Sequence, residues 1–150
     1  MATDWQAFLF LLGEWEGGNE SDPVPGKGAF SFSFALDGNI LVRKNRTVIH
    51  PTSDRDGYTH DDLLTIYNEI TGLKRAIYFD NEDHVIHYEV SVAPDQKTIA
   101  RVNDPVPTAP LFRFTYVSTG EVMDARLEIA PPGEPDGFII YIEGPARRIS

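Results

Sequence analysis

The chain contains no cysteine among its 150 residues. This excludes disulfides, thiolate metal sites and cysteine catalysis within the chain. A domain of this length needs no covalent staple, because it can remove roughly 70% of its unfolded surface from water. The composition fits a reducing compartment, and we expect a cytoplasmic protein that forms a single domain over residues 1–150.

Long apolar runs and basic runs are also missing. No segment is apolar for long enough to span a bilayer, and the first residues lack the basic stretch of a secretory signal. Lys and Arg number 13 against 23 Asp and Glu, so the net charge is −10. An acidic surface repels phosphate backbones and anionic lipids, and we therefore expect neither nucleic acid nor a membrane as a partner.

Helical periodicity is confined to the N-terminal segment. Trp5, Phe8, Leu9 and Leu12 recur at the spacing of one helix face, and Thr3 or Asp4 can cap the segment. The pattern predicts a short helix that packs one apolar stripe against the end of the remaining structure.

Beyond this segment, apolar and polar residues alternate with the period of β-strands. Phe30, Phe32 and Phe34 share one face, and Asp37-Gly38 is a typical hairpin turn. Further strands are predicted over 39–49, 63–68, 73–80, 84–92, 98–102, 111–117, 122–129 and 138–143, with an exposed loop over 53–60. So many strands joined by short turns favour a closed antiparallel meander β-barrel of nine or ten strands with a short N-terminal helix. A two-sheet sandwich is the alternative.

Three segments of the chain resemble known families of β-barrel proteins. The segment Leu12–Gly17 (LGEWEG) resembles the Gly-x-Trp signature that opens the calycin barrels. Residues 10–17, 78–86 and 143–148 resemble a group of uncharacterised bacterial lipocalin-like proteins, a domain of unknown function. The chain is more distantly similar to the nitrobindins and the fatty-acid-binding proteins.

The resemblance implies a barrel with an internal pocket and no particular activity. It also implies that Trp15 closes one end of the barrel beneath an arginine of the last strand, Arg147 or Arg148. Nitrobindins hold haem through a histidine late in the chain, but no histidine follows His87 here. We therefore expect no haem and no other cofactor.

The turns predict which side chains face inward. A three-residue loop over 81–83 places Tyr78 opposite Ile86 and Arg75 opposite Glu89. A four-residue turn over 69–72 then adds Tyr67 to the face of Tyr78. We expect a pocket with three phenols and an aromatic wall, formed by Tyr67, Tyr78, Tyr88, Phe32 and Phe34. A shift of one residue would reverse every assignment.

In this register an apolar patch on the strands over 63–68 and 73–80 faces outward, which suggests a homodimer through these two strands. It consists of Leu64, Ile66, Ile77 and Phe79.

Arg43 is a further candidate ligand-binding residue, and two interpretations of it remain open. Its strand face is either interior or exterior. In the interior, the guanidinium needs a partner such as a ligand carboxylate or Glu143, because an unpaired buried charge is costly. On the exterior, it is an ordinary solvated side chain.

The histidines do not predict a metal site. His84 and His87 point to opposite faces of a strand, and His50 and His60 lie in loop-like sequence, where a site with Asp61 or Asp62 is conceivable. The acidic segment 80–83 lacks the ligand spacing of a calcium loop and is interpreted as a hairpin turn.

Three functions are compatible with these observations. The leading hypothesis is a protein that binds a small, largely apolar molecule inside the barrel, with or without an acid group. The alternatives are an enzyme for a phenolic or cyclic substrate, using Tyr67, Tyr78, Arg43 and Glu143, and a dimeric interaction module with a filled core.

Overall fold

A computed structural model describes residues 5–17 and 26–150. The helix η1 spans Gln6–Leu11 and precedes ten strands. These are β1 (Gly13–Gly17), β2 (Gly26–Ala35), β3 (Ile40–Ile49), β4 (Tyr58–Asn68), β5 (Lys74–Asp80), β6 (Val85–Val92), β7 (Thr98–Asn103), β8 (Leu111–Ser118), β9 (Val122–Ala130) and β10 (Ile139–Arg148).

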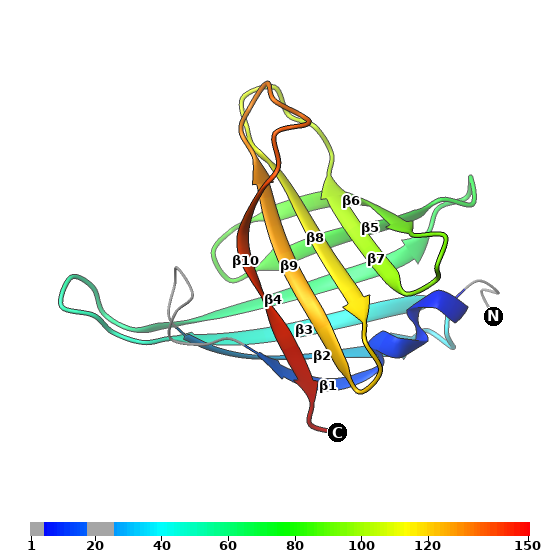
Figure 1. Ribbon diagram of the computed structural model, residues 1–150, viewed down its shortest axis with the longest axis horizontal. Coiled ribbons are helices and arrows are strands. Elements are labelled where there is room, and N and C mark those ends of the chain that lie inside the picture. The colour runs from blue at the N-terminus through cyan, green and yellow to red at the C-terminus, as the bar shows by residue number, and fades with distance from the viewer. Residues whose placement is uncertain (1–4, 18–25) are drawn as a thin grey trace.

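The strands form one closed barrel in which every neighbouring pair is antiparallel. Consecutive strands pair from β1 to β10, and β10 returns to pair with β1 through Trp15 and Arg148. Figure 1 shows β8, β9 and β10 crossing β2, β3 and β4 as two faces of this barrel. This closed strand order confirms the predicted meander barrel and excludes two separate sheets.

The N-terminal helix is present but has a tighter pitch than predicted. It is a 3₁₀ helix, and its inner face has a period of three: Trp5, Phe8 and Leu11 are buried. Leu9, which an α-helix would turn inward, is 41% exposed. The proposed caps Thr3 and Asp4 lie outside the described residues. No helix in the described ranges is long and apolar enough to cross a membrane.

The interior nearest η1 is filled by apolar side chains. Trp5 packs edge-on against Phe34, and Trp15, Leu41 and Leu64 are almost fully buried. The indole N–H of Trp15 donates to the carbonyl of Leu11 at 2.8 Å. Burying such side chains contributes about 1.5–3 kcal/mol each, so this end of the barrel makes a substantial contribution to its stability.

The connection between β4 and β5 corrects the predicted register. Five residues, 69–73, separate these strands, and the amide of Glu69 donates to the carbonyl of Leu73. Ile66 therefore lies opposite Ala76, and Tyr67 lies opposite Arg75. The extra residue turns Leu64 and Ile66 inward, where each is less than 4% exposed, and removes half of the proposed dimer patch.

Candidate functional site at the polar end of the barrel

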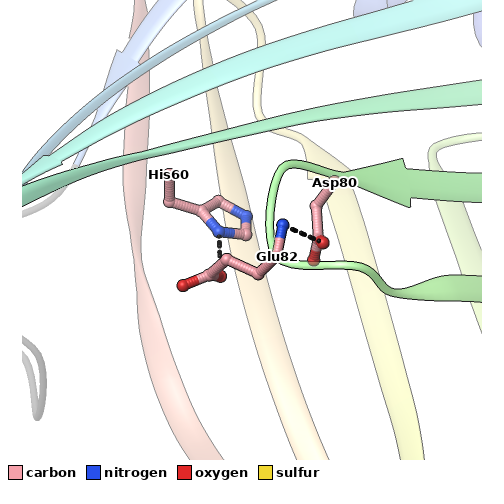
Figure 2. A group of neighbouring side chains, drawn as sticks. All are labelled: His60, Asp80 and Glu82. Atoms are coloured by element: carbon pink, nitrogen blue, oxygen red, sulfur yellow. Dashed lines mark hydrogen bonds and ion pairs between the residues drawn. The ribbon is translucent and has the colours of Figure 1, made fainter.

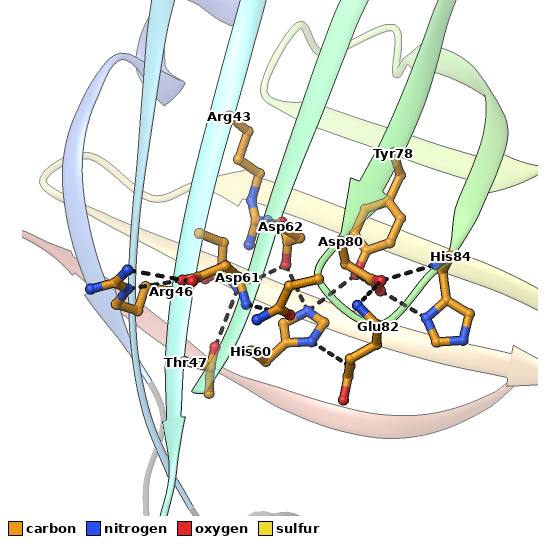
Figure 3. A network of polar contacts seen from close by, with 12 residues as sticks. Arg43, Arg46, Thr47, His60, Asp61, Asp62, Tyr78, Asp80, Glu82 and His84 are labelled. Atoms are coloured by element: carbon orange, nitrogen blue, oxygen red, sulfur yellow. Dashed lines mark hydrogen bonds and ion pairs between the residues drawn. The ribbon is translucent and has the colours of Figure 1, made fainter. Parts of the chain in front are cut away.

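The two ends of the barrel differ in chemistry. Contacts of Trp5 with Phe34 and Lys74 place η1 beside the β2–β3 and β4–β5 turns. The β5–β6 turn lies at the opposite end, because the strands run alternately up and down. Around this opposite end, hereafter the polar end, the strands direct charged and polar side chains toward one another (Figure 3). They include Arg43, His60, Asp62, Tyr78 and Asp80.

Arg43 and Asp62 form a buried ion pair inside the barrel. The Nη1 of Arg43 donates to Oδ1 of Asp62 at 2.7 Å, and their side chains are only 12% and 5% exposed. Asn45 donates to the second carboxylate oxygen at 2.9 Å. The guanidinium also lies 4.9 Å from the ring centre of Phe30. The interior interpretation of Arg43 is therefore correct, and its carboxylate partner is Asp62.

Arg101 is a second buried cation inside the barrel. It is 4% exposed, and its guanidinium lies 4.2 Å from the ring centre of Phe114 and 5.3 Å from that of Tyr88. Its Nη1 donates to the hydroxyl of Tyr116 at 2.9 Å, but its Nε has no partner. No carboxylate of the described residues forms an ion pair with it. Arg101 is thus a cation held by aromatic rings instead of by an anion.

The hydroxyl of Tyr116 accepts the hydrogen bond from Arg101. Burial works to raise the pKa of its phenol, but the positive charges of Arg101 and Arg43 outweigh burial and lower the pKa below the usual value for tyrosine. The pKa of Tyr88 is raised, because burial outweighs the charge of Arg101 there. The interior thus favours negative charge near Tyr116.

A second cluster lies where β4, β5 and the β5–β6 turn meet (Figure 2). The Nδ1 of His60 is 2.7 Å from the carboxylate of Glu82, and its Nε2 is 3.0 Å from that of Asp62. The hydroxyl of Tyr78 lies 3.1 Å from the same Nε2 and donates to Asp80 at 2.9 Å. Sequence reasoning missed this cluster because it interpreted His60 as a loop residue, whereas β4 begins at Tyr58.

The protonation states follow from these contacts. Burial alone would lower the pKa of His60, but the hydrogen bond with Glu82 and the charge of Asp62 raise it. Burial alone would raise the pKa of Asp80, but hydrogen bonds from the amides of His84 and Glu82, and then from the side chains of His84 and Tyr78, lower it to about 2. The pKa of Tyr78 is raised, first by burial and then by Asp62 and Asp80. Asp80 is therefore an anion and Tyr78 a neutral donor at neutral pH.

The structure separates the other predicted site residues into two groups. Tyr78, Tyr88, Phe32 and Phe34 belong to the inner face, and the predicted β5–β6 register, with Tyr78 opposite Ile86, is confirmed. Tyr67 is the exception: it shares the outer face with Arg75, because the β4–β5 connection is one residue longer than predicted.

Glu143 also points away from the interior. Its side chain is 51% exposed and pairs with Arg126 at 3.7 Å. The combination of Tyr67, Tyr78, Arg43 and Glu143 suggested for an enzyme is therefore not assembled.

The last strand resolves the choice between two arginines. The guanidinium of Arg148 lies 4.3 Å from the ring centre of Trp15 and donates to the carbonyls of Leu12 and Phe10. Arg147 faces outward with a 75% exposed side chain and pairs with Glu16 at 3.6 Å. Neighbouring residues of a strand point to opposite faces, so only one of the two could cover the indole.

A groove of about 710 Å³ lies along the outer face of β1–β5. Its lining includes a cross-strand row that faces outward, formed by Ser31, Lys44, Leu63 and Phe79. Phe79 is 43% exposed there. The lining also includes Phe30, Asn45 and Asp62, so this hollow borders the strands that carry the Arg43–Asp62 pair.

The fold and its inner charges define a closed ten-stranded meander barrel with one apolar and one polar end. No protein-family model matches the chain, and no curated protein matches it.

Proposed function

We propose that this chain is a lipocalin-like protein that binds a small amphipathic acid, with the acid group of the ligand at Arg101 and Tyr116. The observation that carries the proposal is the burial of Arg101 without a carboxylate partner. Removing a charge from water costs several kcal/mol unless the charge is paired, and an apolar residue of similar volume would stabilise the core better. A residue kept at such a cost fits a role in binding.

The surroundings of Arg101 indicate the chemistry of the ligand. The Nε without a partner, in a guanidinium that also bonds Tyr116, offers a donor to a carboxylate, sulfonate or phosphate group. Phe114, Tyr88 and Phe32 supply apolar surface for the body of the ligand. Arg43 strengthens the preference for an anion through its effect on Tyr116. A small acid with an apolar body satisfies both requirements.

The test compares two ligands that differ only in charge. Isothermal titration calorimetry with decanoate and decanol should show decanoate binding about tenfold tighter or more, because a charge-assisted hydrogen bond contributes about 1.5–3 kcal/mol. In Arg101→Met this difference should disappear while the protein remains folded. Arg46→Met, on the outer face with a 70% exposed side chain, is the matched control and should bind as the unmodified protein does.

Two results would contradict the proposal. One is equal affinity for decanoate and decanol in the unmodified protein. The other is an Arg101→Met variant that still prefers the acid. Native mass spectrometry of protein purified without refolding provides a second readout, because a retained acid should be absent from Arg101→Met.

A further inference from the structure

The cluster around His60 has a feature that the binding of an acid at Arg101 does not use. His60 comes from β4, Asp80 from the end of β5, and Glu82 from the turn that follows. Each offers one ligand atom, and these atoms lie within 4.8 Å of one another. Metal bonds of about 2.0–2.2 Å to nitrogen and oxygen place neighbouring ligand atoms about 3–4 Å apart, so a small movement of the exposed Glu82 side chain suffices.

The contacts of the imidazole indicate a metal ligand. Nδ1 faces Glu82, whereas Nε2 faces the buried carboxylate of Asp62 at 3.0 Å. Histidines that bind metals usually donate their other ring N–H to such a carboxylate, which sets the tautomer and the ring orientation. Asp62 is in turn held by Arg43 and Asn45. The ring is thus held at Nε2 and presents Nδ1 to the carboxylate of Glu82.

The charges of the cluster also favour the binding of a cation. Within the described residues, the carboxylates of Asp80 and Glu82 form ion pairs only with histidines, His84 and His60. The Asp80 side chain is 2% exposed, and the amides of Glu82 and His84 hold its Oδ1. Its Oδ2 accepts from the hydroxyl of Tyr78 at 2.9 Å and lies 2.9 Å from the Nδ1 of His84, so a second imidazole stands beside this carboxylate.

We propose that His60, Asp80 and Glu82, with His84 beside them, bind one divalent transition-metal ion at the polar end of the barrel. Mixed imidazole and carboxylate ligands favour Zn²⁺ or Mn²⁺ over Ca²⁺, which prefers oxygen ligands alone. Asp62 acts as the positioning residue for His60. The site does not depend on the proposed acid ligand.

After bound metals are removed with a chelator, isothermal titration calorimetry measures the binding of Zn²⁺ to the full chain. One ion should bind per chain, and His60→Ala and Glu82→Gln should each weaken binding by about tenfold or more. His87→Ala removes a histidine on the exposed face of β6, and Asp83→Asn removes a neighbouring charge from the same turn; both controls should bind like the unmodified protein. Asn is suited to position 83, because it tolerates the left-handed backbone found there, with φ 68°.

Two further readouts separate metal binding from folding. The melting temperature of the metal-free Glu82→Gln variant should equal that of the unmodified protein, because Glu82 is exposed. Co²⁺ should give a visible absorption band that disappears in His60→Ala. Binding of Zn²⁺ that is equal in all four variants, or no binding to the unmodified protein, would overturn the proposal.

Discussion

At the η1 end of the barrel, Trp15 is 1% exposed and its only polar atom is bonded, whereas at the polar end the inner face carries Arg43, Asp62 and His60. The first arrangement gains free energy from burial. The second arrangement costs free energy, because buried charges lose their hydration and their mutual attraction offsets only part of that loss. The comparison indicates that the η1 end contributes more to the stability of the fold, and it fits the binding role that we propose for the charged interior.

The largest expected effect is at the η1 end. Trp15→Ala should lower the free energy of unfolding by about 3–5 kcal/mol, because it leaves a cavity between η1, Phe30 and Arg148. Urea unfolding monitored by circular dichroism measures the loss. Leu9→Ala, on the exposed side of η1, should cost less than about 1 kcal/mol. Equal losses in the two variants would mean that this end does not maintain the fold.

The next effect tests which face of β4 is internal. Leu64→Ala should cost about 2–5 kcal/mol, since Leu64 is fully buried, whereas the neighbouring Leu63→Ala should cost about 1 kcal/mol or less. The same unfolding measurement applies to both variants. A reversed order would restore the register in which Tyr67 faces inward.

The polar end should respond differently to single and double changes. Asp62→Leu leaves the guanidinium of Arg43 without its carboxylate and should cost about 2–4 kcal/mol. The double variant Arg43→Met/Asp62→Leu removes both charges and should return to within about 1 kcal/mol of the unmodified protein. Additive losses in this double-mutant cycle would show that the ion pair stabilises the fold in the way the η1 end does.

The smallest effect concerns the two arginines of β10. Arg148→Met should lower stability by about 0.5–1.5 kcal/mol, because it removes a cation from the face of Trp15 and donors from the carbonyls of Phe10 and Leu12. Arg147→Met should leave the melting temperature unchanged. Thermal unfolding of the two variants decides whether Arg148 closes the η1 end of the barrel. A larger loss of stability in Arg147→Met would argue against that role.

Much of the barrel could be predicted because it depends on local patterns. Phe30, Phe32 and Phe34 alternate with small residues, and Asp37-Gly38 joins β2 to β3. The loop at 81–83 set the register of β5 and β6 correctly. The start of β4 was missed for a physical reason: the inner face of the strand is polar at His60 and Asp62, so the apolar alternation that marks a strand is absent there.

The sequence by itself determined that the chain forms a meander of antiparallel strands, since alternation and turn residues act over a few neighbouring positions. Tertiary structure decided what the barrel contains. One additional residue between β4 and β5 reverses the face of Tyr67 and Leu64, and closure then brings Arg43 to Asp62 and Arg101 to Tyr116. Such pairs depend on registers added up around the whole barrel, in which a single step exchanges inside for outside.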